Sequence, residues 1–258
     1  MKVPVLIVAW KRPDKLKNVI SALRQVKPEK VFIACDGPRT ENEKDIKLVL
    51  ETRRTLIEEI DWNCSIKRWF QDNNQGCRIG VSEAINWFFE HIDQGIILED
   101  DCVAHPDFFS FTSELLDFYK NDKRIWCISG NNFQEGKWHG DGSYYFSKYP
   151  HCWGWATWKD RWVNYKEELT KWDLLKKSKL IYSIFPKRKE RNYYIKLFNR
   201  LKNENQPDSW AYRWFFICQI YNGLTILPNE NLVKNIGFDT DSTHTKDGSA
   251  PDINEFKK

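Results

Sequence analysis

The segment Gly95-Ile-Ile-Leu-Glu-Asp-Asp-Cys-Val-Ala-His-Pro-Asp-Phe-Phe109 contains the strongest fold signal in the chain. Its first four residues are apolar and predict a short buried strand. The strand ends on three consecutive carboxylates, Glu99, Asp100 and Asp101. Adjacent carboxylates repel one another and are costly to desolvate, unless a hard divalent cation and phosphate oxygens lie among them. With Pro106 placed to start a helix, the segment predicts a nucleotide-diphosphate site that binds Mn²⁺ or Mg²⁺. A solvated acidic turn is the alternative.

Short apolar runs alternate with helical patterns through the first half of the chain. The predicted strands are 3–9, 31–35, 64–70, 95–98 and 125–129. The predicted helices are 13–25, 41–59, 78–91 and 106–120. This alternation favours an α/β fold with a mixed, mainly parallel central sheet and helices on both faces. Because ligands bind beyond the carboxyl ends of such strands, the polar residues that follow each strand are expected to converge.

The second half is less regular. Residues 143–147 and 224–227 predict strands, 210–221 a helix, and 229–245 a mainly polar loop. Tryptophan rings can stack on sugars, although most of them pack in cores. The acceptor-side candidates are Trp153, Trp155 and Trp210.

Composition sets limits on the class of protein. The chain has 258 residues, of which 41% are hydrophobic, enough for one large α/β domain or two small ones. No run approaches the ~18 apolar residues of a membrane-spanning helix, and the first strand begins too early for a signal peptide. We therefore expect a cytoplasmic protein. Seven widely spaced cysteines indicate reduced thiols, and the lack of a nucleic-acid-binding module predicts no nucleic-acid partner.

Residues 171–202 form a basic segment with eleven Lys or Arg and two acidic residues. Its apolar residues recur at spacings of three and four on either side of Pro186, which predicts amphipathic helices. Such a segment can lie on an anionic membrane surface, here the inner face of the cell membrane. It can equally be a solvated helix pair packed on the domain.

The acidic segment resembles the metal motif of GT-A-type glycosyltransferases, and most closely that of the N-acetylglucosaminyltransferase I family and its bacterial relatives. The likeness continues through residues 106–109 and 125–132, and includes the first strand followed by Arg12. The resemblance implies a single GT-A-type domain over 1–258. Residues 1–132 would form the nucleotide-sugar-binding half, and 133–258 an irregular acceptor-binding and catalytic half.

By this resemblance, Arg12 and Asp36 contact the uridine of a UDP-sugar donor. The loop with Asn74, Gly76 and Arg78 borders the nucleoside. For Asp36 and the loop, a purely structural turn is the alternative. Position 11 departs from the family, which has an acidic residue where this chain has Lys11.

The resemblance also implies roles at the metal. Asp101 is the direct ligand, Asp100 hydrogen-bonds ribose and sugar hydroxyls, and Glu99 contacts the transferred sugar. Several GT-A families bring a histidine near the C-terminus to the metal or diphosphate, and His244 stands at that place. The alternative is a solvated histidine in a polar loop.

Asp208 matches the catalytic aspartate of the resembled family, which takes a proton from the acceptor hydroxyl. A flanking Trp and a second Asp of the family pattern are missing in Pro207-Asp-Ser-Trp210. Because Asp is also a favoured helix N-cap, capping is the alternative role. The next carboxylates in line as the base are Glu135, Asp141 and Asp160.

Together these residues predict a metal-dependent inverting glycosyltransferase. It would move a sugar, with N-acetylglucosamine expected, from a UDP-sugar to a hydroxyl of a glycan or lipid-linked glycan, in surface polysaccharide or lipopolysaccharide synthesis. One alternative is a sugar-1-phosphate nucleotidyltransferase, which uses a glycine-rich loop after the first strand that Ala9-Trp-Lys-Arg-Pro-Asp14 does not provide. The other is a non-catalytic nucleotide-sugar-binding module.

Overall fold

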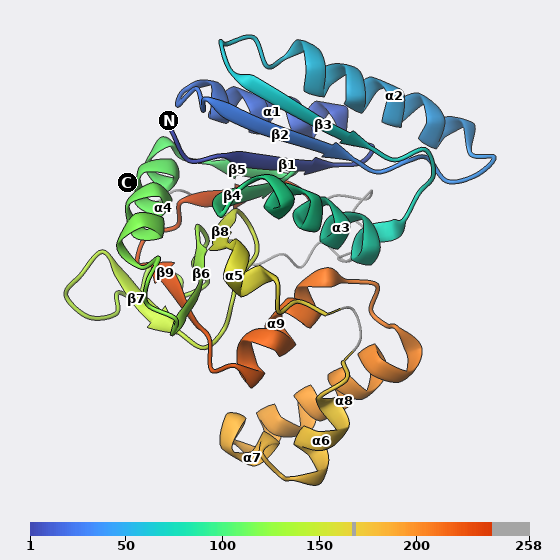
Figure 1. Ribbon diagram of the computed structural model, residues 1–258. Coiled ribbons are helices and arrows are strands. Elements are labelled where there is room, and N and C mark those ends of the chain that lie inside the picture. Colours follow the sequence, from blue (N-terminus) through green and yellow to red (C-terminus); the bar gives the residue numbers. More distant parts are fainter. Residues whose placement is uncertain (167–168, 239–258) are drawn as a thin grey trace.

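The computed structural model describes residues 1–166 and 169–238, which form a mixed sheet with helices on both faces (Figure 1). Within these residues, eight strands join one sheet in the order β3-β2-β1-β4-β8-β6-β9-β7. A small second sheet pairs β10 with β5. The strands are β1 Val5–Ala9, β2 Lys30–Cys35, β3 Ser65–Phe70, β4 Gln94–Glu99, β5 Cys102–Ala104, β6 Ile125–Ser129, β7 Tyr144–Ser147, β8 Trp155–Trp158, β9 Leu224–Pro228 and β10 Val233–Asn235.

The helices largely fill the connections between strands, as an α/β pattern requires. They are α1 Pro13–Arg24, α2 Glu43–Glu58, α3 Gly76–His91, α4 Pro106–Phe118, α5 Lys159–Trp162, α6 Trp172–Lys177, α7 Ile181–Ile184, α8 Arg188–Glu204 and α9 Trp210–Ile220. The fold class predicted from the sequence is confirmed. The five strands and four helices predicted in the first half all form, with small shifts at their ends.

The sheet is mainly parallel. β3, β2, β1 and β4 pair in parallel, and so do β6 and β9. Two strands run the other way: β8 pairs antiparallel with both β4 and β6, and β7 closes the edge antiparallel to β9. Strands from 1–132 and from 133–258 thus share one sheet, and the division into two functional halves stays a prediction.

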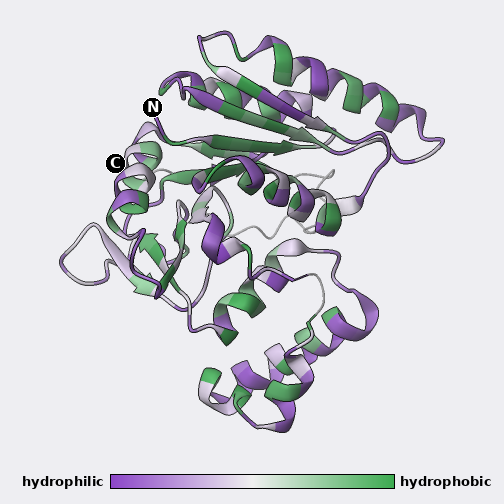
Figure 2. Ribbon diagram, viewed as in Figure 1, coloured by the Kyte–Doolittle hydropathy of each residue, from purple (hydrophilic) through white to green (hydrophobic). Residues whose placement is uncertain are grey.

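β1 shows why the centre of the sheet is apolar on both faces. All five of its residues are buried. Val5 and Ile7 belong to one core cluster with α1 and α2, whereas Leu6 and Val8 belong to the opposite cluster with α3 and α9. In Figure 2 the central strands are correspondingly green. A strand that is covered on both faces has a continuous run of apolar residues, and the sequence of β1, Val-Leu-Ile-Val-Ala, is such a run.

Two prolines start the helices that follow the site-forming strands. α1 begins at Pro13, directly after Arg12, and α4 begins at Pro106. The His105 imidazole caps α4 by accepting a hydrogen bond from the Asp107 amide at 3.3 Å. Proline is favoured at this position because its missing N–H would have no partner there. The helix start predicted at Pro106 is confirmed.

The structure differs from the sequence analysis at two places in the second half. Residues 155–158, for which no strand was predicted, form β8, a buried strand near the centre of the sheet. The predicted loop 229–245 contains β10, whose Asn235 lies opposite Cys102 of β5. The second difference matters for function, because this pairing fastens residues 233–235 beside the acidic triplet.

The basic segment forms α6 and α7 before Pro186 and α8 after it, as predicted (Figure 1). These helices lie below α9 in that view, on the far side of the molecule from α2. No helix in the described part of the chain combines the length and the apolar character needed to cross a membrane. All seven cysteines are free.

Candidate active site

A pocket of about 560 Å³ opens at the carboxyl ends of β1, β2 and β4, and is closed from the other side by the start of α9 and by residues that follow β10. Among the residues predicted to bind the nucleotide, the pocket lining contains Arg12, Asp36, Asn74 and Gly76. Among those predicted to bind the sugar or the metal or to act in catalysis, it contains Glu99, Asp100, Asp101 and Asp208. The expected convergence is confirmed for residues that follow β1, β2, β3 and β4, and is wrong for residues 130–132 after β6, which do not line this pocket. The individual roles of the converging residues stay predictions.

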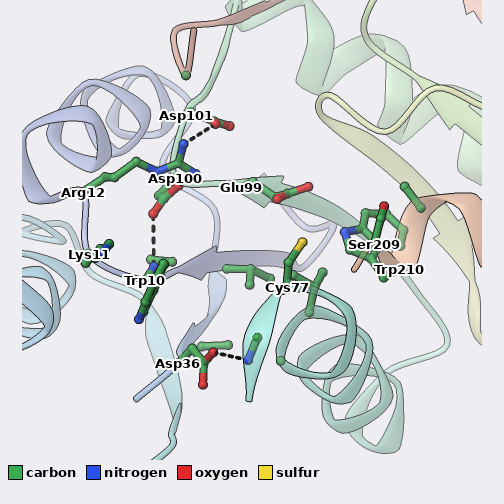
Figure 3. Close-up of a pocket in the computed structure, with 18 of the residues that line it drawn as sticks. Trp10, Lys11, Arg12, Asp36, Cys77, Glu99, Asp100, Asp101, Ser209 and Trp210 are labelled. Carbon is green, nitrogen blue, oxygen red and sulfur yellow. Dashed lines mark hydrogen bonds and ion pairs between the residues drawn. The ribbon is translucent and has the colours of Figure 1, made fainter. Parts of the chain in front are cut away.

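Arg12 holds two members of the acidic triplet (Figure 3). Its Nη1 donates to Asp101 Oδ2 at 2.7 Å, and its Nη2 donates to Asp100 Oδ1. The amide of Trp10 donates to the other Asp100 oxygen at 3.1 Å. Asp100 is only 2% exposed, so these contacts supply the hydrogen bonds that a buried carboxylate needs. The triplet is therefore partly neutralised by the residue that starts the β1–α1 connection.

Glu99 points away from Arg12, toward Trp210 (Figure 3). Burial raises the pKa of Glu99 to about 8, and the negative charges of Asp101 and Asp100 add to this, while Arg12 and a hydrogen bond with the Trp210 side chain oppose it. Near pH 7 and without a ligand, the three acids thus carry fewer than three negative charges. A bound cation would counter the part of this shift that comes from the charges of Asp101 and Asp100, whereas the larger part, which comes from burial, would remain.

Asp36 fastens the loop before α3. Its carboxylate accepts hydrogen bonds from the amides of Gly37, Gln75 and Gly76 and from the Asn74 side chain, at 2.8–3.1 Å. These donors occupy most of the acceptor positions that a carboxylate offers. In this structure Asp36 therefore builds the wall that a nucleoside would contact. A direct hydrogen bond from Asp36 to uridine stays a prediction.

Asp208 faces the pocket from the loop before α9. Its side chain is 47% exposed, and Oδ1 lies 3.4 Å from Nε of Arg78. The N-cap of α9 is Ser209, not Asp208. Asp208 therefore does not cap the helix, and its carboxylate is open to an acceptor. Figure 3 places the neighbouring Ser209 and Trp210 across the pocket from Arg12.

The three acceptor-side tryptophans behave differently. Trp155 is fully buried in β8, with its ring 5.4 Å from that of Trp210 in a stacked pair, so its prediction as an acceptor contact is wrong. Trp210 is 2% exposed and reaches the pocket through its contact with Glu99. Trp153 is half-buried at the pocket wall and remains a candidate.

Sequence reasoning missed Asn235 and Gly237. The amide of Ile236 donates to the Asp101 carbonyl at 2.9 Å, and the amide of Gly237 donates to Asn235 Oδ1 at 2.7 Å. A Cβ on Gly237 would lie 2.2 Å from Asp101 Oδ2 and 2.9 Å from Asn235 Oδ1. Two side-chain oxygens therefore converge on a cradle that only glycine leaves open. The only sign of this site in the sequence is the tripeptide Asn235-Ile236-Gly237, which is short and lies in a segment that was predicted to be a polar loop.

The oxygen atoms of this cradle are of the kind that a hard cation prefers. Asp101 and Asn235 present a carboxylate and an amide oxygen, which are ligand types for Mg²⁺ and Mn²⁺, whereas both oxygens of Asp100 already accept hydrogen bonds from Arg12 and Trp10. A small protein share of the coordination shell is normal where phosphates supply the rest. Among the described residues no group of three or more His, Cys, Asp or Glu side chains is arranged to hold a metal ion, so a cation here would take most of its ligands from phosphate or water. His244 lies outside the described residues, and its role stays a prediction.

Trp10 forms a second feature that was missed. The Lys11 ammonium lies 4.2 Å and the Arg39 guanidinium 5.4 Å from its ring centroid. Both cations also bind Asp45, which is buried beneath them. Lys11, the position that departs from the resembled family, thus belongs to a cationic and aromatic wall. A wall of this kind suits a phosphate or a nucleobase.

The remaining nucleophiles and carboxylates are unsuited to catalysis here. Burial raises the pKa of the Cys77 and Cys152 thiols, which stay protonated near neutral pH. Glu135, Asp141 and Asp160, the reserve candidates for the base, do not line the pocket. Asp160 is paired instead with Lys123 and Arg161.

No protein-family model and no curated protein matches the chain. Among solved structures, it is similar to a cytidylyltransferase from Leptospira borgpetersenii, with 17% identity over 63% of each chain and a TM-score of 0.36. It is similar to a UDP-glucose pyrophosphorylase complexed with UDP-glucose, with 9% identity over 87% of this chain and 90% of that one and a TM-score of 0.41.

A third similar structure is the glycosyltransferase GlyE of Streptococcus pneumoniae, with 9% identity, 84% of this chain and 43% of that chain covered, and a TM-score of 0.39. The chain spans less than two thirds of the length of the cytidylyltransferase and of GlyE. These similarities are low, and the function proposed below rests on the pocket itself.

Proposed function

We propose that the chain is a metal-dependent glycosyltransferase that takes a UDP-sugar donor and transfers the sugar, with inversion, to a hydroxyl of a glycan or lipid-linked glycan. One observation carries the proposal. A single pocket holds the oxygens of Asp101 and Asn235 on one side and an open carboxylate, Asp208, on the other. Sugar transfer needs a positive charge at the departing diphosphate and a base at the acceptor hydroxyl, and both must reach the same donor sugar.

The donor side is proposed to bind the diphosphate. Asp101, with Asn235 beside it, would hold Mn²⁺ or Mg²⁺, and the cation would offset the charge that develops on the departing nucleotide diphosphate. Arg12 brings a positive charge to this place, because it contacts Asp100 and Asp101. If the cation takes over the carboxylate of Asp101, the guanidinium of Arg12 can bind a phosphate with two parallel hydrogen bonds.

On the acceptor side, Asp208 is proposed as the general base. One of its carboxylate oxygens takes the proton of the acceptor hydroxyl while the hydroxyl oxygen attacks the anomeric carbon. The bond from that carbon to the diphosphate oxygen breaks in the same step. Arg78 positions the carboxylate by its ion pair at 3.4 Å. Trp153 supplies a half-buried aromatic surface on the same pocket.

The rival activity, a sugar-1-phosphate nucleotidyltransferase, has less support from this geometry. Its triphosphate would need a glycine-rich loop, but only Trp10, Lys11 and Arg12 connect β1 to α1. The amide of Trp10 in this short connection already donates to Asp100. The two activities also differ in product. Given pyrophosphate and a UDP-sugar, the rival forms UTP and a sugar 1-phosphate, whereas a transferase releases UDP.

Nucleotide-dependent thermal stability tests the proposed donor. With Mn²⁺ present, UDP should raise the melting temperature more than GDP, ADP or CMP. A nucleotide at ~100 times its dissociation constant adds about 2.7 kcal/mol to the free energy of unfolding, which is readily measured. The matched control is UDP with EDTA, which should stabilise far less. A larger shift with GDP or CMP would show that the donor is not a UDP-sugar.

A further inference from the structure

A lysine-rich lobe, defined as residues 171–202, projects from the domain as α6, α7 and most of α8 (Figure 1). Its inner side is aromatic. Trp172, Phe185 and Phe198 are fully buried, and the Phe198 ring lies 5.0 Å from that of Phe216 in α9. The lobe is thus held on the domain by its own core, and its outer residues are not needed for that packing.

The outer side carries an excess of positive charge. The lobe contains eleven Lys or Arg against two acids, a net charge of +9, although the whole chain has only +4. Both acids are already paired: Asp173 with Lys202, and Glu190 with Lys148 at 3.2 Å. The positive charge of the lobe is therefore not offset by its own acids.

Several of these cations are exposed and form no ion pair with any residue in 1–166 or 169–238. They are Lys177, Lys179, Arg188, Lys189 and Lys196. Figure 2 shows α8 as largely purple. Five unpaired cations on one projecting element attract an anionic surface rather than stabilise the fold.

Apolar side chains stand exposed among the same cations. Leu174 is 66% exposed and Leu180 is 52% exposed, and Tyr182 and Tyr193 are exposed as well. The Arg191 guanidinium lies 4.2 Å from the Tyr182 ring centroid. Leu174 and Leu180 flank Lys176, Lys177 and Lys179 in the sequence. Cationic and apolar side chains therefore occur together in α6 and in the turn that follows it.

We propose that the lysine-rich lobe docks on a lipid bilayer with anionic headgroups. The headgroups would neutralise the unpaired lysines, and the leucine and tyrosine side chains would enter the boundary between headgroups and acyl chains. A nucleic acid would use the cations but would leave the exposed leucines in water. The combination of both side-chain types favours the bilayer.

The lobe is close to the pocket along the chain. α8 ends at Glu204, and Asp208 follows after three residues. The Tyr194 ring of α8 also stacks on the Phe215 ring of α9, the helix that begins at Trp210 of the pocket, with the ring centroids 4.7 Å apart. A docked lobe would therefore hold the Asp208 side of the pocket near the membrane surface. Docking itself is independent of the proposed sugar chemistry.

Vesicle co-sedimentation of the full chain, without nucleotide, tests the proposal. The protein should pellet with phosphatidylcholine vesicles that contain phosphatidylglycerol, pellet little with pure phosphatidylcholine, and be released in part by salt. The triple substitution Lys177→Gln, Lys179→Gln and Lys189→Gln should lower the apparent affinity by about 100-fold, because each lysine near the surface contributes several-fold. Leu174→Ser with Leu180→Ser should remove the binding that persists in high salt.

The matched control removes the same charge elsewhere. Lys17→Gln, Lys44→Gln and Lys47→Gln change three exposed lysines of α1 and α2 and should leave vesicle binding unchanged. All of these residues are exposed, so circular dichroism should show a native fold in every variant. Equal losses in the two triple variants, equal binding to neutral vesicles, or RNA binding that is tighter than vesicle binding and insensitive to the leucine changes would each overturn the proposal.

Discussion

Asp208→Asn should lower kcat by about 100-fold or more while leaving the affinity for the UDP-sugar and Mn²⁺ almost unchanged. An amide cannot take a proton from the acceptor hydroxyl, and a positioned general base contributes on the order of 10²–10⁴ in rate. Donor affinity should persist because Asp101 and Arg12 lie across the pocket from Ser209 and Trp210, the residues that follow Asp208 in the chain (Figure 3). Single-turnover transfer measures the first effect, and calorimetric titration of the donor with Mn²⁺ measures the second.

The structure supplies the control for this variant. Asp208 does not cap α9, since Ser209 is the N-cap, so the substitution does not remove a helix cap. It does remove the charge of the ion pair with Arg78. Arg78→Gln breaks that pair and keeps the carboxylate, so it should cost much less turnover than Asp208→Asn. Near-normal turnover in Asp208→Asn, or equal losses in both variants, would rule out Asp208 as the base.

Asp101→Ala should abolish Mn²⁺-dependent UDP binding and transfer together. The substitution removes the carboxylate of the cradle, and losing such a ligand should cost more than the ~10–100-fold typical of residues one shell further out. The fold should survive, because Arg12 keeps its pair with Asp100 and one of three crowded carboxylates is gone. Titration of UDP in the presence of Mn²⁺ or EDTA, together with a melting curve, checks both parts.

Gly237→Ala should block the same site without removing any charge, because it places a methyl group against the side-chain oxygens of Asp101 and Asn235. Its methyl group would lie 2.2 Å from Asp101 Oδ2, in the space where the cation is proposed to bind. The Mn²⁺ dependence of UDP binding should weaken as in Asp101→Ala. Gly142→Ala is the matched control, because its methyl group would meet no atom closer than 3.7 Å. Wild-type Mn²⁺ dependence in both Asp101→Ala and Gly237→Ala would contradict the metal assignment.

The sequence predicted the first half of the fold because its strands are apolar and are separated by long amphipathic helices. It did not predict β8, since Trp155-Ala-Thr-Trp158 neither alternates nor resembles a typical apolar run. This strand is recognised only by its pairing with both β4 and β6. The same burial explains why Trp155 is a core residue and not an acceptor contact.

Much of the pocket could also be predicted, because parallel strands bring their carboxyl ends to one edge of the sheet. Three features required the three-dimensional structure. The hydrogen bonds of Asp36 to the loop before α3 cross 40 positions of sequence, and the pairs of Arg12 with the acidic triplet cross nearly 90. Asn235 and Gly237 reach Asp101 only because the three-residue strand β10 pairs with β5.

Release of UDP from UDP-sugars tests the central claim most directly. Purified protein with Mn²⁺ should convert a UDP-sugar, with UDP-N-acetylglucosamine first in the panel, to UDP and either a glycosylated acceptor or free sugar. EDTA and Asp101→Ala should both stop the reaction. The account would be contradicted if no UDP-sugar yields UDP, if EDTA has no effect, or if UTP and sugar 1-phosphate form when pyrophosphate is supplied.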